Sequence, residues 1–182
     1  MPSNAIDSFF CKDTSIVIIP KINLKRLDLI EGSYGPFLVG RQIEIPIWLA
    51  ELLYKSGKCT ILPPEFLTCS FLERVVEEER ASETVLSTQL PRYFFELSKL
   101  FLDVLFSGSA VAASATGVTL ERPQQVRILV QNIGDLRLKK IHTAVLRDLA
   151  RGSALQLDGI TQAEASMMRL FLVKRQIHFC LL

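Results

Sequence analysis

The chain has 182 residues, of which 49% are apolar and 22% are charged, and its formal net charge is +2. This length suits one domain of ordinary size or two small ones, and the apolar content excludes a chain that is disordered throughout. Because positive and negative residues are well mixed, the sequence lacks the basic stripe that marks many nucleic-acid-binding proteins.

The mean hydropathy of +0.29 is high for a soluble monomer. A membrane-spanning helix needs roughly 20 consecutive apolar residues, and the nearest candidate, residues 93–106, is interrupted by Glu96, Lys99 and Asp103. The composition therefore favours a subunit that covers apolar surface against partners, with no membrane association. The N-terminus lacks the pattern of a secretory signal, and four scattered cysteines without a C-x-x-C pair indicate a reducing compartment.

The first third of the chain predicts short strands and turns. β-Branched or alternating apolar residues favour strands at 15–19, 24–30, 43–47 and 59–62. From Trp48 the apolar spacing becomes helical, and Ser56-Gly57 offers a helix stop. Pro63-Pro64 prevents the last strand from continuing. We therefore expect a small β-rich domain at residues 1–62.

The remainder of the chain predicts helices. Apolar faces at helical spacing indicate helices at 65–80, 93–106 and 123–149, and Thr161-Gln-Ala-Glu164 is a capping box that begins a last helix. Residues 107–122 are rich in small side chains and predict a long loop. The expected fold class is α+β: a small N-terminal β-rich domain followed by a C-terminal α-helical bundle domain at 63–182, with a long loop near 107–122.

The sequence contains no enzymatic motif. Its two histidines, His142 and His178, belong to no metal-ligand pattern. A nucleophilic pair formed by Cys180 and His178, or a zinc site formed by the scattered cysteines and histidines, is less well supported than a free thiol and a surface histidine. No catalytic residue, metal ligand or cofactor-binding residue is expected.

Two charged runs have both a functional and a structural interpretation. The acidic run at 77–79 could bind a metal, but a solvated helix end is the favoured interpretation. The basic residues Arg137, Lys139-Lys140 and Arg147 could contact phosphate. The charged outer face of a long helix explains them without a ligand.

The broad apolar helix faces predict a core, and beyond it an interface with partners. The candidate partner-interface residues are Tyr93, Phe94, Leu97, Phe101, Val130, Ile141, Val145 and Phe171. Trp48 lies where a strand changes to a helix, so a local core role is favoured over a partner anchor. The candidate core residues of the domain junction are Trp48, Pro63, Pro64 and Phe66.

Short motifs in a fixed order, from about Ile16 to Lys174, resemble those of a known family. Ile45-Pro46-Ile47-Trp48-Leu49-Ala50 is similar to the family's V-P-L-W-L-A, and Cys59-x-x-Leu62-Pro63-Pro64-Glu65-Phe66 is similar to its C-x-x-L-P-P-E-W. Tyr93-Phe94-x-Glu96-Leu97 and Leu157-Asp158-x-Ile160-Thr161-x-x-Glu164 resemble its later segments. On these residues the chain is identified as a member of the Psf-two (partner of Sld-five, subunit two) family of GINS complex subunits, which are eukaryotic DNA replication factors.

The resemblance implies a non-catalytic structural subunit of the heterotetrameric GINS complex, located in the nucleus. It implies the three other GINS subunits as partners, with the MCM motor and the Cdc-type cofactor in the replicative CMG helicase, which acts in initiation and elongation. Direct DNA contact is possible but not indicated. Two other hypotheses remain. A stand-alone helical adaptor would be a stable monomer or homodimer, and a small enzyme would need a pocket with shifted pKa values.

Overall fold

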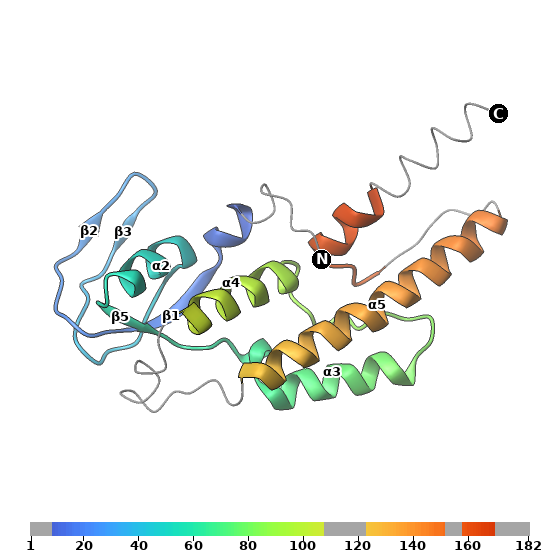
Figure 1. Ribbon diagram of the computed structural model, residues 1–182. Coiled ribbons are helices and arrows are strands. Elements are labelled where there is room, and N and C mark those ends of the chain that lie inside the picture. The colour runs from blue at the N-terminus through green and yellow to red at the C-terminus, as the bar shows by residue number, and fades with distance from the viewer. Residues whose placement is uncertain (1–8, 108–122, 152–157, 170–182) are drawn as a thin grey trace.

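The computed structural model describes residues 9–107, 123–151 and 158–169. The strands and one short helix gather at one end of the molecule, and the long helices form the other end (Figure 1). This arrangement confirms the expected α+β class, with the β-rich part first in chain order. The expected loop near 107–122 lies outside the described residues, except that Ser107 ends a helix.

The N-terminal part is built on a three-stranded antiparallel sheet in the order β4-β1-β5. The strands are β1 (Ser15–Pro20), β4 (Ile43–Pro46) and β5 (Cys59–Ile61), and the 3₁₀ turn η1 (Cys11–Asp13) precedes them. Side chains of β1 alternate: Ile16 and Ile18 are buried, whereas Val17 is exposed. This is the period of two that allows one face of a sheet to cover a core.

A separate two-stranded hairpin contains β2 (Leu27–Asp28) and β3 (Ser33–Tyr34). The strand expected over 24–30 is therefore wrong in length. The chain already turns after Asp28, where the amide of Leu29 donates to the carbonyl of Gly32 at 2.9 Å, so no ladder can extend further. Leu24 forms only an isolated bridge with Phe37.

The change from strand to helix occurs one residue before Trp48, because α2 (Ile47–Lys55) begins directly after Pro46. After β5, the helix expected from Glu65 is divided into a 3₁₀ turn, η2 (Glu65–Leu67), and α3 (Cys69–Ala81). Thr68 separates them because its backbone is extended, with φ −75° and ψ 143°, and its hydroxyl donates to the carbonyl of Glu65 at 2.8 Å.

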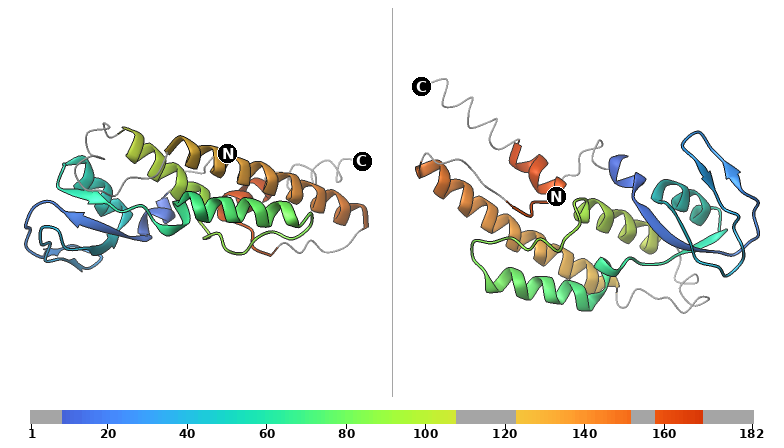
Figure 2. Two further views of the ribbon diagram at one scale, coloured as in Figure 1. Left: turned by 90° about the horizontal axis from the view of Figure 1, so that it is seen from below. Right: turned by 180° about the vertical axis from the view of Figure 1, so that it is seen from behind.

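The C-terminal part contains α3, α4 (Phe94–Ser107), α5 (Pro123–Arg151) and a last helix at 162–169. With 29 residues, α5 is about 44 Å long, and α3 and α4 pack along it (Figure 2). Among the helices that the structure describes, none is long and apolar enough to span a bilayer.

A single apolar core connects the two parts of the molecule. It extends from Ile18 and Phe37 in the β-rich part to Leu72 of α3, Phe94 of α4 and Ile133 of α5. On α5, Val126, Ile133, Ile141 and Val145 are buried. Leu138 is 38% exposed, so this part of the helix is not covered by the core.

Candidate protein-interaction site

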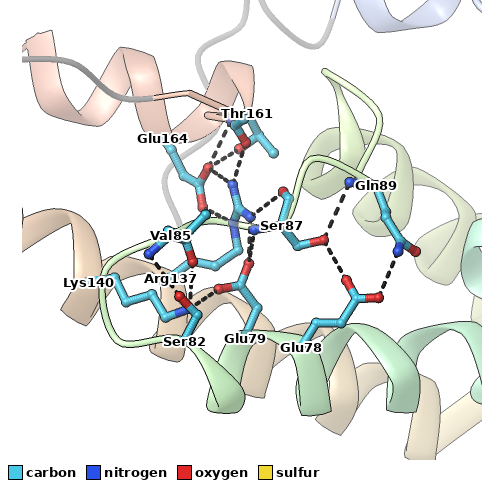
Figure 3. A network of polar contacts seen from close by, with 11 residues as sticks. Glu78, Glu79, Ser82, Val85, Ser87, Gln89, Arg137, Lys140, Thr161 and Glu164 are labelled. Atoms are coloured by element: carbon cyan, nitrogen blue, oxygen red, sulfur yellow. Dashed lines mark hydrogen bonds and ion pairs between the residues drawn. The ribbon is translucent and has the colours of Figure 1, made fainter.

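A buried ionic network joins α3, α5 and the last helix, and Arg137 lies at its centre (Figure 3). The Arg137 guanidinium donates from Nη1 to Oε1 of Glu79 at 2.7 Å. It also makes a bidentate pair with Glu164, from Nε to Oε1 at 2.7 Å and from Nη2 to Oε2 at 2.9 Å. All three side chains are fully buried. This planar two-bond geometry is the one that arginine offers to a carboxylate and lysine cannot reproduce.

Two backbone carbonyls complete the guanidinium shell. Arg137 Nη1 donates to the carbonyl of Ser87 at 3.0 Å, and Nη2 donates to that of Gly159 at 2.7 Å. Gly159 has φ +73°, and a Cβ built there would lie 3.1 Å from Cγ2 of Thr88. Glycine therefore allows this turn to lie close against residues 86–88, in a left-handed conformation that other residues rarely adopt, with its carbonyl accepting from Arg137.

Glu79 has a second cation, because Lys140 Nζ donates to its other carboxylate oxygen. The amide of Ser87 donates to Oε1 of Glu79 at 3.0 Å, and Lys140 also donates to the carbonyl of Val85 at 3.0 Å. The segment between α3 and α4 is thus hydrogen-bonded to Glu79 of α3 and to Arg137 and Lys140 of α5. Two cations and two carboxylates give the network no net charge.

The capping box expected at Thr161 takes part in the same network. The amide of Thr161 donates to Oε2 of Glu164 at 2.8 Å, which is the backbone half of the predicted box. The Thr161 hydroxyl donates to the same oxygen at 2.8 Å. One glutamate therefore caps the last helix and binds Arg137, so the start of this helix is fixed to α5.

The pKa shifts in this network follow from burial opposed by charge. Burial by itself raises the pKa of Glu79, but hydrogen bonds from Lys140, the Ser87 amide and Arg137 together lower it below its ordinary value. Burial likewise lowers the pKa of Arg137, but the Glu164 and Glu79 carboxylates raise it on balance. The network therefore holds its charges in pairs, which is a structural arrangement rather than a reactive one.

These contacts correct two interpretations made from the sequence. Glu79 is buried and does not belong to a solvated helix end, and Arg137 is not on the outer face of α5. Helical spacing could have revealed both residues. Glu79 follows Leu72 by seven residues on α3, and Arg137 lies midway between Ile133 and Ile141 on α5, so each occupies the apolar face of its helix.

An apolar groove of about 320 Å³ lies between the second half of α5 and the last helix. It is lined mainly by the apolar side chains Leu138, Ile141, Val145, Met167 and Met168, with Lys139, His142 and Glu164 at its sides. Leu146, one turn further along α5 than His142, is 42% exposed. Flexible methionine side chains are frequent at surfaces that adapt to a partner. Within the described residues of the helical part, this groove offers an apolar surface suited to binding another protein.

The structure assigns several candidate interface residues to the chain's own core. The buried ones are Phe94, Leu97, Phe101, Ile141 and Val145. Tyr93 and Val130 are half-buried and remain at the surface. Of the five buried residues, Ile141 and Val145 line the groove, and they form a second small core cluster with Leu86. Phe171, His178 and Cys180 lie outside the described residues.

The candidate residues of the domain junction lie in two places. Pro63, Pro64 and Phe66 line a cavity of about 310 Å³ between β1 and α4, and the Phe66 ring meets that of Phe94 edge to face at 6.1 Å between centroids. Trp48 is half-buried and lies elsewhere, because its ring packs edge to face on Tyr34 of β3 at 6.3 Å. Trp48 therefore stabilises the β-rich part itself.

The described residues contain no group of three or more histidine, cysteine, aspartate or glutamate side chains that could hold a metal ion. The free thiol of Cys59 is buried, and desolvation raises its pKa to about 11 even though Lys21 opposes the shift. A thiol with this pKa is protonated near neutral pH and is a poor nucleophile.

Comparison with known proteins adds family evidence along most of the chain. A family model described as PSF2 N-terminal domain matches residues 4–62, and one described as GINS complex protein helical bundle domain matches residues 66–174. The DNA replication complex GINS protein PSF2 of Homo sapiens is 30% identical over 171 residues, which cover 93% of this chain and 86% of that protein. The protein of the same name from Debaryomyces hansenii is 33% identical over 184 residues, covering 98% and 82%. That from Xenopus laevis is 28% identical over 172 residues, covering 93% and 86%.

Proposed function

The chain belongs to the PSF2 family of GINS complex subunits, and on that premise we propose that it is a structural subunit of a heterotetrameric GINS complex in DNA replication. The observation that carries this proposal is the order of the two family matches, which together extend over residues 4–62 and 66–174. The apolar groove on α5 supports it, because a subunit of an obligate complex covers such surface with a partner.

The proposal extends to a non-catalytic role and to particular partners. The three other GINS subunits are the direct partners, and through them the chain joins the MCM motor and the Cdc-type cofactor in the CMG helicase of the nucleus. The pairing of Arg137, Lys140, Glu79 and Glu164 with one another supports a scaffold, since these charges are occupied in holding helices together.

We also place a domain boundary between residues 62 and 63. β5 ends at Ile61, and Pro63-Pro64 separates it from the helical part. The two domains would not be independent, because the same apolar core contains residues from both.

The assembly surface in this proposal is the groove beside Leu138, and a charge placed there tests it. Leu138→Asp introduces a carboxylate into an apolar groove, which a partner would have to desolvate without pairing. Leu52→Asp is the matched control, since Leu52 is also an exposed helical leucine but lies on α2 in the β-rich part, 61% exposed.

The chain is co-expressed with the three other GINS subunits, and the product is examined by size-exclusion chromatography with light scattering. We expect a particle with one copy of each subunit, a loss of about tenfold or more in recovered complex for Leu138→Asp, and wild-type recovery for Leu52→Asp. A chain that remains a stable monomer in the presence of the other three subunits would refute the scaffold role and favour the stand-alone adaptor. Wild-type recovery of Leu138→Asp would refute this groove as the assembly surface.

A further inference from the structure

A second surface, at the outer end of the sheet, combines positive charge with aliphatic side chains. In Figures 1 and 2, β5 runs from this end toward the helices, so the end of β1 and the start of β5 lie away from the helical part. We call this surface the basic–aliphatic end. All its members are exposed, and they are Lys21, Ile22, Leu38, Val39, Arg41 and Lys58.

The surface is formed by three chain segments, residues 20–23, 38–41 and 58, and hydrogen bonds of the backbone hold them together. The amide of Lys21 donates to the carbonyl of Lys58 at 2.8 Å, and the amide of Gly40 donates to the carbonyl of Pro20 at 3.0 Å. The side-chain oxygen of Asn23 accepts from the amide of Val39 at 2.9 Å. The three cations therefore extend from a fixed backbone platform rather than from separate flexible loops.

The positive charge of this surface is not neutralised within the part of the chain that the structure describes. Ion pairs there involve Lys12, Arg26, Lys55, Arg137 and Lys140, whereas none involves a cation of the basic–aliphatic end. Beside these cations lie three exposed aliphatic side chains, of which Leu38 is 44% and Val39 57% exposed. Charge and apolar area are thus offered to a partner on the same surface.

We propose that the basic–aliphatic end is a docking surface for an acidic protein segment that also carries aliphatic side chains. Carboxylates of that segment would pair with Lys21, Arg41 and Lys58, and its apolar side chains would cover Leu38 and Val39. Charge complementarity of this kind fixes partner choice and increases the rate of association. The inference goes beyond assembly of a GINS complex, because this surface lies on the β-rich part and not on the groove of α5.

The side chains at this surface favour a protein segment over nucleic acid. Single-stranded nucleic acid is bound by aromatic side chains on which bases stack, together with cations. The apolar members here, Ile22, Leu38 and Val39, are aliphatic and offer no ring for stacking. Aliphatic side chains between cations match a polypeptide in which acidic and apolar residues are interspersed.

The test is a binding titration of the full chain, in the oligomeric form in which it purifies. The probe is a fluorescent peptide of about twelve residues in which Asp and Glu alternate with Leu and Val. Two comparison probes have the same length: a peptide in which Ser replaces Leu and Val, and a single-stranded oligodeoxynucleotide. We expect the acidic–aliphatic peptide to bind at least about tenfold more tightly than either, and to weaken as salt is raised.

Matched variants assign the binding to this surface. Lys21→Glu with Arg41→Glu and Lys58→Glu is expected to weaken binding by about tenfold or more. The control with the same change in net charge reverses three exposed cations of the helical part that lie outside the groove of α5, Arg80, Lys99 and Arg169, and is expected to bind as wild type. Leu38→Ser with Val39→Ser keeps all charges and is expected to weaken binding several-fold.

Three results would overturn the proposal. The first is unchanged binding in both the charge-reversed and the Leu38/Val39 variants. The second is equal affinity for the two peptides, which would show attraction by net charge alone. The third is tighter binding of the oligodeoxynucleotide with loss in the Lys21/Arg41/Lys58 variant, which would make this a nucleic-acid surface. If the charge-reversed variant fails to fold, the Leu38/Val39 variant decides: weaker peptide binding would support the proposal, and unchanged binding would overturn it.

Discussion

Arg137→Leu is expected to be among the most destabilising single substitutions in this chain. The guanidinium makes three hydrogen bonds to two fully buried carboxylates and two more to backbone carbonyls. Glu79 would keep Lys140, but Glu164 would keep only the amide and hydroxyl of Thr161. Removing one partner of a buried ion pair costs about 3–5 kcal/mol, because the other charge remains without compensation.

In the stability loss of Arg137→Leu, the effect of the uncompensated buried carboxylates can be separated from the effect of lost packing. In a triple variant, Glu79→Gln and Glu164→Gln accompany Arg137→Leu, so no buried carboxylate is left uncompensated. Lys140 can reach solvent, since its side chain is 9% exposed and lies at the border of the network. Glutamine also serves in a capping box, so the start of the last helix is retained. We expect the triple variant to recover stability to within about 2 kcal/mol of wild type.

The assay is urea-induced unfolding followed by two probes. Far-ultraviolet circular dichroism reports mainly on the helices, and the fluorescence of Trp48, the single tryptophan, reports on the β-rich part. Because one core joins the two parts, both probes should give the same midpoint. Arg80→Leu, an exposed arginine beside Glu79, is the control and should change the free energy of unfolding by no more than about 0.5 kcal/mol.

Two outcomes would refute this reasoning. An Arg137→Leu protein as stable as Arg80→Leu would mean that the ionic network contributes nothing to folding. A triple variant no more stable than Arg137→Leu would mean that packing of the arginine stem, rather than uncompensated charge, accounts for the loss.

Three further predictions concern pH, backbone conformation and thiol reactivity. The folded-state pKa of Glu79 is lowered, so its contribution to stability is present above the ordinary glutamate pKa and is lost as pH falls through the folded value. The free energy of unfolding should therefore decline below about pH 4.5. The decline should be less steep in Glu79→Gln. Gly159→Ala should cost about 1–3 kcal/mol in urea unfolding and more than Gly40→Ala, because both glycines have positive φ but only Gly159 is crowded by neighbouring atoms. At about pH 8, a thiol reagent mapped by mass spectrometry should modify Cys59 far more slowly than the half-buried Cys69, and equal rates would contradict the raised pKa of Cys59.

Much of the fold was predictable because the signals are local. A run of β-branched residues identified β1 and alternating isoleucines identified β4, and prolines marked where β5 had to end and where α5 begins. Helical spacing identified α3, α4 and α5 to within a few residues. The length of β2 was not predictable in this way, because a strand also needs a partner strand. The chain turns after Asp28, so the residues that follow have no partner with which to extend the ladder.

The candidate site was less predictable, because a periodic pattern shows which face of a helix is apolar but not what covers it. Phe94 and Phe101 were expected at an interface, and the structure buries them inside the chain. The groove beside Leu138 arises only where the last helix lies against α5, so no single stretch of sequence contains it.

The sequence alone determined the order of strands and helices, the change at Pro63-Pro64 and the family, since these depend on neighbouring residues and on motifs read in order. Only the tertiary structure decided that Arg137, Glu79 and Glu164 are buried. Arg137 is 58 residues from Glu79 and 27 from Glu164 along the chain, and each charge can leave water only because an opposite charge is brought to it. A charge is buried only together with partners that compensate it, and folding brings those partners together from distant segments of the chain.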